Sequence, residues 1–563
     1  MVYRREASAF TDAREYLFKH DILREVTYES VLKRLRRRYH GLVADWLITQ
    51  VGGRAGEYSG LIAGHLLQAG RKEQAGAYFL QAGQAALALY ANAEAEAYFR
   101  QGLELSPAND QKAAYLVGLG EAIRLQGFRQ QETEEIFRSG IDLFMKLEDN
   151  DAAANLYMRL SKVLSEKDYQ KAWDACQEGL MRLDGAPESP GLAELLAEAG
   201  KAAHLRTRPT EEVISLCQRA IEMAERQGEL EAKIHASITI ALLTTDFEKS
   251  IQLLQEAVTF SEANRWLRMT CRAHLNLGSF LENEFQNLEL AHQHHMRCLD
   301  ISISVSDIEM IFFELFNLAW NLIEQGQLNT LIDKLAELLR SSTAPESRVK
   351  EFLDNARSWL FSPKGQWTQA LEYRRHRQNE LRETRLYQFI ASNNLHLANE
   401  CLELNRFTGM AYLAGAKASL QENIEISWRA IQSRFLLVVI SARQERFTEA
   451  HERLAEVIKD LDTPIRKSQK VFSYNTEAEL ARAEGRWEAA VANCHALIDI
   501  YQAGGYRWLW ARQLIDLGDA LIGRNLPGDR EQAERVYRES LEMFTEMGAP
   551  GYIQVLEERL GGM

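Results

Sequence analysis

The sequence has few residues that interrupt helices and no apolar run long enough to cross a membrane. Only 9 of its 563 residues are proline, which inside a helix removes a hydrogen bond and clashes with the preceding turn. Strong helix formers such as alanine, leucine and glutamate dominate, and no convincing run of alternating β-branched residues indicates a strand. These absences predict an all-α protein without a β-sheet and without a membrane-spanning helix.

Cysteine is also scarce, and none of the six cysteines lies in the C-x-x-C spacing that is typical of zinc or redox sites. A buried free cysteine behaves as a small apolar residue, and thiols stay reduced in the cytosol. The charged N-terminal stretch does not fit a signal peptide. We therefore expect a cytoplasmic protein with six reduced, buried cysteines: Cys176, Cys217, Cys271, Cys298, Cys401 and Cys494.

The motifs of common catalytic sites are missing as well. No stretch matches G-x-x-x-x-G-K-[ST], the loop whose backbone N–H groups cradle phosphates, and no Ser-His-Asp or Cys-His set can be proposed. His292, His294, His295 and Cys298 fall within two helical turns, but their i, i+3 and i, i+4 pairs point to different sides of a helix, whereas zinc needs convergent ligands. The sequence predicts no enzyme, no cofactor and no metal.

The charge is unevenly distributed along the chain. The formal net charge is −14, whereas residues 1–40 hold ten Lys or Arg against six Asp or Glu. An acidic body lacks the basic footprint that nucleic-acid binding needs. The basic residues at 34–38 are not interleaved with stacking aromatics, so we interpret them as a solvated or interdomain face.

What the sequence does contain is a repeat of about 40 residues. It is clearest at Gly365–Arg377, where a small residue ends one helix, Trp367 follows, and the small anchor Ala370 comes three residues later. Equivalent anchors follow one another at steps of 37 to 43 residues, and such a period is typical of a solenoid. The anchors are Ala95, Thr133, Ala172, Val213, Ser250, Ala291, Leu331, Ala370, Met410, Ala450, Ala490 and Ala533.

This period predicts an all-α, right-handed α-α superhelix of the tetratricopeptide (TPR) type. We expect about twelve helix pairs over residues 72–548, each helix about one turn longer than in the usual 34-residue unit. Residues 1–65 are expected to form two or three short helices that do not repeat, and residues 549–563 a polar capping helix, because the outer face of a terminal repeat has no neighbour.

The stretch Tyr16–Leu47 resembles a known family. Its Phe18-Lys19-His20, Glu25-Val26 and Tyr28-Glu29-Ser30 steps and its Arg-rich helix are similar to the junction in bacterial multidomain signalling NTPases, where an ATPase core is followed by a TPR array. The 40-residue step resembles the sensor array of the maltose-regulon activator family. The resemblance implies a TPR sensor arm without the NTPase core, since the phosphate loop is missing.

The most specific site prediction is a ladder of asparagines in the first helices of the pairs. An amide at this position lines the concave groove of TPR proteins and can both donate to and accept from a peptide backbone. The predicted groove residues are Asn276, Asn317, Asn355, Asn394 and Asn475. The alternative is that these amides bond to neighbouring helices or water.

The repeat therefore predicts a non-enzymatic interaction or sensor module that binds a protein or peptide segment in its groove. Two alternatives stay open. The array could sense a small molecule, as the resemblance to the maltose activator implies, or it could be a regulatory piece of an ATP-dependent signalling enzyme whose catalytic domain is on another chain.

Overall fold

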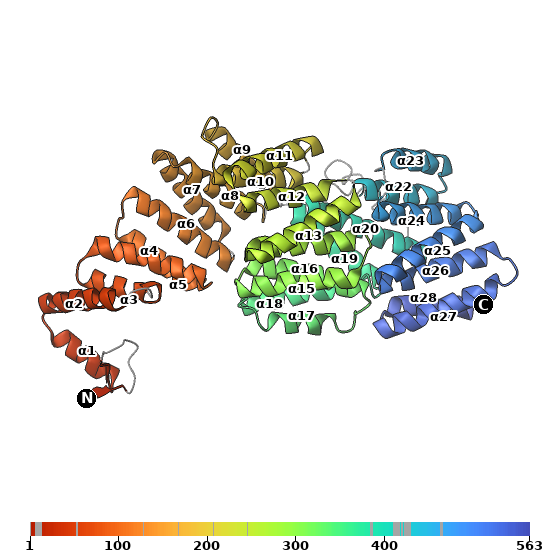
Figure 1. Ribbon diagram of the computed structural model, residues 1–563. Coiled ribbons are helices and arrows are strands. Elements are labelled where there is room, and N and C mark those ends of the chain that lie inside the picture. The colour runs from red at the N-terminus through yellow and green to blue at the C-terminus, as the bar shows by residue number, and fades with distance from the viewer. Residues whose placement is uncertain are drawn as a thin grey trace. The chain divides into compact units, whose positions relative to one another are not determined.

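The computed structural model describes residues 2–5, 14–51, 55–127, 129–166, 168–206, 208–244, 246–382, 387–408, 417, 420, 430–461 and 466–563. Helices fill nearly all of these ranges, and successive helices lie side by side (Figure 1). The all-α prediction is thereby confirmed. The chain divides into two compact units, residues 1–163 and 164–563.

The first unit contains a small hairpin followed by helices. Its elements are β1 (Val2–Arg4), β2 (Tyr16–Phe18), α1 (Asp21–Ser30), α2 (Lys33–Val51), α3 (Ala55–Gln68), α4 (Lys72–Ala88), α5 (Asn92–Glu104), α6 (Asn109–Gln126) and α7 (Gln130–Lys146), with α8 (Asn150–Leu164) at its end. A core of buried side chains runs from Ala44 in α2 to Ile123 in α6.

The hairpin corrects the prediction that the chain has no β-sheet. β1 and β2 pair antiparallel, with Val2 opposite Phe18 and Arg4 opposite Tyr16. Three residues are too few to produce a readable alternating pattern, so sequence periodicity could not show these strands. Most of their side chains are exposed, and the hairpin adds nothing to the buried core.

The second unit continues the array of helix pairs. Its helices are α9 (Tyr169–Arg182), α10 (Pro190–Leu205), α11 (Thr210–Gln227), α12 (Leu230–Leu243), α13 (Phe247–Ala263), α14 (Leu267–Asn283), α15 (Leu288–Ser304), α16 (Ile308–Glu324), α17 (Leu331–Leu339), α18 (Glu346–Trp359), α19 (Trp367–Arg382), α20 (Tyr387–Thr408), α22 (Ala430–Arg443), α23 (Phe447–Lys459), α24 (Lys467–Ala483), α25 (Trp487–Gly504), α26 (Arg507–Arg524), α27 (Asp529–Met547) and α28 (Pro550–Gly561).

The repeat anchors lie where the prediction put them, in the first turn of the second helix of each pair. Each of the eleven anchors within the described residues is at most 2% exposed, including the polar Thr133 and Ser250. The twelfth, Met410, lies outside the described residues. A small side chain at this position lets paired helices approach closely, so the 40-residue period reflects helix packing.

One residue before the first predicted anchor has the burial of an anchor. Ser59 in α3 lies 36 residues before Ala95 and is fully buried, as an anchor would be. α3 packs against both α2 and α4. The predicted boundaries at residues 65 and 549 stay predictions, but the helices on either side of residues 69–71 are in direct contact.

In the second unit, turns of the middle pairs contact the ends of the last helices. The bonds that join them are Lys467 Nζ to the Phe285 carbonyl (2.6 Å), Ser468 N–H to Glu284 Oε2 (3.2 Å), Tyr506 Oη to the Glu282 carbonyl (2.7 Å), Trp508 Nε1 to the Pro363 carbonyl (3.0 Å) and Asn329 Nδ2 to the Glu546 carbonyl (3.3 Å). Segments about 145 to 224 residues apart in sequence are thereby held together.

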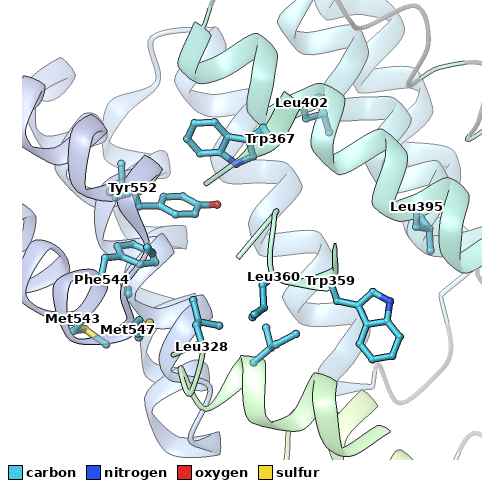
Figure 2. Packing of buried hydrophobic residues seen from close by; sticks show 14 of the residues in the cluster. Leu328, Trp359, Leu360, Trp367, Leu395, Leu402, Met543, Phe544, Met547 and Tyr552 are labelled. Carbon is cyan, nitrogen blue, oxygen red and sulfur yellow. The ribbon is translucent and has the colours of Figure 1, made fainter. Parts of the chain in front are cut away.

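An apolar cluster seals the same contact (Figure 2). The ring of Tyr552 stacks on Phe544 at 4.4 Å between centroids and meets Trp367 edge-on at 5.2 Å. Beside it the Gly551 N–H donates to the Lys364 carbonyl at 3.0 Å, and a Cβ on Gly551 would come within 2.2 Å of the Gly365 carbonyl oxygen. Only glycine permits two backbones to lie this close.

Two cysteines differ from the prediction that all six are reduced. The structure joins Cys271 of α14 to Cys298 of α15 by a disulfide, with Cα atoms 4.5 Å apart. Adjacent helices bring these two side chains face to face, which the 27-residue separation in sequence does not reveal. The other four cysteines are in no disulfide and are buried, as predicted.

Among the described residues, no helix combines the length and the apolar character that crossing a membrane requires.

Candidate functional site

A buried network of charged side chains connects the first helices of successive pairs near the C-terminus. It draws on α20, α22, α24, α26 and α28, and we call it the inner ionic cluster. Its members are Glu403, Arg406, Arg443, Glu479, Arg482, Arg512, Asp516, Asp519 and Arg559.

Asp516 lies at the centre of the inner ionic cluster. Its carboxylate accepts hydrogen bonds from Arg482 Nη1 at 2.9 Å and Arg512 Nη1 at 2.6 Å, and it also pairs with Arg406. Arg406 reaches Asp519 at 2.8 Å as well. The Arg406 side chain is 8% exposed and that of Asp516 is 6% exposed, so the centre of the network is shielded from water.

The arginines determine the charge state of the acids. Burial alone would raise the pKa of Asp516, but Arg406, Arg512 and Arg482 outweigh it and lower that pKa well below its usual value. For Glu479, burial also opposes ionisation, yet Arg443, Arg482 and Arg406 lower the pKa to about 2. Asp516 and Glu479 are therefore ionised at neutral pH, and ion pairs join five helices.

The five predicted groove asparagines do not share one environment. Asn355 is exposed, Asn276, Asn317 and Asn475 are half-buried, and Asn394 is fully buried. The Asn276 amide donates to the Arg272 carbonyl of its own helix at 2.7 Å, and Asn394 Oδ1 accepts from Gln378 Nε2 at 2.9 Å.

Asn394 therefore matches the alternative that the amide bonds to a neighbouring helix in the free protein. Repeat spacing places residues at equivalent positions along the array, but it cannot report how far neighbouring helices cover each position. A groove role for the five asparagines stays a prediction.

The four candidate ligands in α15 turn to four separate partners. His292 Nδ1 lies 3.1 Å from Asn321 Oδ1, His294 Nδ1 lies 2.8 Å from His274 Nδ1, and His295 Nδ1 lies 2.9 Å from Glu314 Oε2. Cys298 is in the disulfide described above. These side chains diverge, as the sequence spacing predicted.

The N-terminal helices present a large exposed apolar surface. Of the 23 large apolar side chains that are exposed among the described residues, 12 lie before residue 47. No residue of α1 is buried, and Ile22 in α1 is 74% exposed. We call six of these exposed residues the N-terminal apolar face: Ile22 and Val26 of α1, Leu32 of the connection to α2, and Tyr39, Leu42 and Val43 of α2.

Positive charge borders the N-terminal apolar face. Arg34, Arg37 and Arg38 are exposed on α2, and none forms an ion pair with another described residue. Arg36, by contrast, pairs with Glu29 at 2.8 Å and lies over the Tyr28 ring. The sequence showed the basic stretch and the helical spacing of the apolar residues, but only the fold shows that both sets of side chains are exposed.

The C-terminal helix α28 differs from α1 and α2 in that its apolar side chains are mostly buried. In α28 the apolar residues Tyr552, Val555 and Leu556 are buried, and the residues that face solvent are polar ones such as Glu557 and Glu558. The C-terminal helix thus covers the array, whereas α1 and α2 leave their apolar side chains exposed.

No family model and no curated protein matches the sequence. Solved helical structures are similar at low identity. The crystal structure of a Rap protein complexed with competence and sporulation factor is 13% identical, covers 73% of this chain and 97% of its own, and has a TM-score of 0.36. Yeast Tom70 is 12% identical, and the match covers 77% of this chain and 97% of Tom70 with a TM-score of 0.33. The apo form of RapI is 14% identical, and the match covers 62% of this chain and 98% of RapI with a TM-score of 0.32. Similarity this low carries no inference about function.

Proposed function

We propose that this chain is a non-enzymatic protein-interaction module that docks a protein partner on its N-terminal apolar face. The concentration of exposed apolar side chains before residue 47 carries the proposal. Large exposed apolar patches are uncommon on monomeric proteins and are typical of interaction sites. A ten-residue helix without buried residues is also marginal on its own in water, so a partner would stabilise α1.

The charge of the face defines the partner. Arg34, Arg37 and Arg38 border the apolar side chains and have no acidic partner among the described residues. A complementary surface therefore carries carboxylates around an apolar patch, an arrangement that raises the association rate and favours one orientation. The same segment resembles the junction that follows an ATPase core in bacterial signalling proteins. The partner we propose is an NTPase core of that kind, in the cytoplasm, with this chain as its regulatory arm.

This site replaces the concave groove of the sequence prediction as the principal one. In the last pairs, the first helices are joined by the inner ionic cluster, whose charges already satisfy one another. A peptide that entered there would have to separate buried ion pairs, which is costly. The N-terminal apolar face needs no such rearrangement.

Site-specific photocrosslinking tests this proposal. A benzophenone side chain at position 39 or 42 is expected to capture a protein that contains a phosphate-binding loop, identified by mass spectrometry. The same label at Leu290, an exposed position on α15, is the control. Leu32→Glu should reduce capture about tenfold or more, because it places a charge in the apolar contact. Equal capture from positions 39 and 290, or capture of a second copy of this chain, would contradict the proposal.

A further inference from the structure

A second candidate site lies in the second unit, between α9 and α11. It is a half-open cleft of about 470 Å³ whose walls are α9 and α11 and whose floor includes α10. α9 and α11 are second helices of their pairs, so this cleft is on the opposite side of the helix pairs from the first helices that carry the inner ionic cluster. It shares no residue with the N-terminal apolar face.

The connection between α9 and α10 accounts for the cleft. It runs over residues 183–189, whereas the connection between α11 and α12 has only two residues, 228 and 229. Gly185 adopts a positive φ of 77° within it, a conformation that glycine adopts without strain. The connection lines the cleft with residues 183–186, and α10 contributes Leu192 and Leu196.

The apolar side chains of the cleft repeat at helical spacing. Trp173 and Leu180 are seven residues apart on α9, and Leu216 and Met223 are seven apart on α11. Each wall thus presents apolar groups two turns apart along its helix. A trough of this kind matches the anchors of an amphipathic helix, which recur at i, i+3 or i+4, and i+7.

Trp173 also forms a wall of a neighbouring cavity of about 130 Å³. The Arg208 guanidinium lies 5.9 Å from the centre of its ring and pairs with Glu212 at 2.9 Å. Trp173 is therefore held from one side by a cation and presents apolar surface to the cleft. Aromatic side chains in such a position are common anchors of protein interfaces.

Two charged groups on the cleft remain available. Asp184 and Arg219 line it, are exposed, and form no ion pair with another described residue, whereas Glu212 is engaged by Arg208. The available charges are of opposite sign. A ligand that carries one acidic and one basic group beside its apolar groups would satisfy both.

We propose that the α9–α11 cleft binds an amphipathic helix of a partner protein. The helix places about three large apolar side chains on Trp173, Leu180 and Leu216, an acidic residue toward Arg219 and a basic residue toward Asp184. A small molecule fits less well, because small-molecule sites usually cover 70–90% of their ligand, whereas this cleft is open along one side.

A selection with displayed peptides tests the proposal on the full chain. The library consists of helical 18-residue peptides that are randomised on one face, and enriched peptides are then measured by fluorescence anisotropy. We expect apolar residues at i, i+4 and i+7 with flanking charges of both signs. Leu180→Glu, a half-buried position in the cleft, should weaken binding about tenfold or more.

The matched control is Met181→Glu, on the same helix but 73% exposed and outside the cleft. It should change affinity less than about twofold. Ser215→Trp, an exposed rim position, fills the cleft without altering the core and should also abolish binding. Arg219→Glu should favour peptides in which the facing acidic residue is replaced by lysine.

Three outcomes would overturn the proposal. The first is that no helical peptide is enriched, and the second is that enriched peptides bind Leu180→Glu as tightly as the unaltered chain. The third is that anilinonaphthalene sulfonate binds in a Leu180-dependent manner while no peptide does, which would assign the cleft to a small apolar ligand. Because the crosslinks at positions 39 and 42 are read separately, each proposal can fail without the other.

Discussion

Neutralising Asp516 should open the C-terminal part of the second unit. Asp516 is surrounded by Arg406, Arg482 and Arg512, and each of these side chains is less than 15% exposed. Asp516→Asn keeps the shape of the side chain but leaves three guanidinium groups without their shared counter-charge. Removing one partner of a buried ion pair typically costs about 3–5 kcal/mol, and here exposure is too low for solvent to reduce that loss much.

The loss of stability in Asp516→Asn should be confined to the helices around the inner ionic cluster. In a repeat array, stability is approximately a sum of contributions from each unit and its neighbours, so amide hydrogen exchange should accelerate in α20, α24 and α26 and stay unchanged in α4 and α6. Glu534→Gln is the control, since Glu534 pairs with Arg538 on an exposed surface of α27. It should cost less than about 0.5 kcal/mol.

Two further measurements sharpen the argument. Arg406→Met added to Asp516→Asn removes one of the three positive charges that faced Asp516, so the double variant should be more stable than the sum of the single losses predicts. Because Glu479 and Asp516 have lowered pKa values in the folded chain, they contribute stability above about pH 4 that is lost as pH falls, and Asp516→Asn should weaken this acid dependence. If Asp516→Asn behaves like Glu534→Gln, the inner ionic cluster does not hold these helices together.

The remaining predictions concern packing, the asparagines, pH and nucleotide binding. Ala370→Trp and Ala490→Trp overfill anchor positions that are at most 2% exposed and should each cost about 1–3 kcal/mol or more; unchanged hydrogen exchange around residue 370 would refute that anchor. Asn317→Ala with Asn355→Ala should weaken binding of a groove peptide by about 0.5–1.5 kcal/mol per lost hydrogen bond with little change in Tm, whereas a large drop in Tm with intact affinity would make the two residues structural. Burial lowers the pKa of His294 to about 4, so only the unfolded chain binds a proton there between pH 4 and about pH 6.5, and the free energy of unfolding should rise with pH over that interval. In His294→Phe, the midpoint of urea unfolding should depend less on pH between these values. Calorimetry should detect no ATP binding by the chain alone, since the phosphate loop is missing from its sequence; micromolar affinity would contradict this.

The helix pairs could be predicted from the sequence because their determinants are local. An anchor such as Ala95 or Ala533 is small because two helices must approach closely, and this requirement recurs at every step. Ser59, which lies before the predicted array, is buried to the same degree as these anchors.

The candidate sites could be predicted only in part. The bond between Arg406 and Asp519 joins residues 113 positions apart, and no local pattern indicates that such residues meet. The asparagine ladder illustrates the reverse case, because residues at equivalent repeat positions, such as Asn355 and Asn394, differ from exposed to fully buried. Burial at those positions depends on contacts between distant segments of the second unit, and the repeat period gives no information about these contacts.

The bonds between the middle pairs and the last helices also bear on how the chain folds. A simple array forms contacts only between neighbours and can fold as it is synthesised. Here Tyr506 must reach the Glu282 carbonyl across 224 residues, and contacts of such high sequence separation slow folding. At about 5–20 residues per second, the ribosome needs roughly 10–45 s to make the intervening segment. During that time the turns of α14–α15 and α18–α19 lack their contacts with the last helices. A chaperone that shields these turns would raise the yield of folded chain.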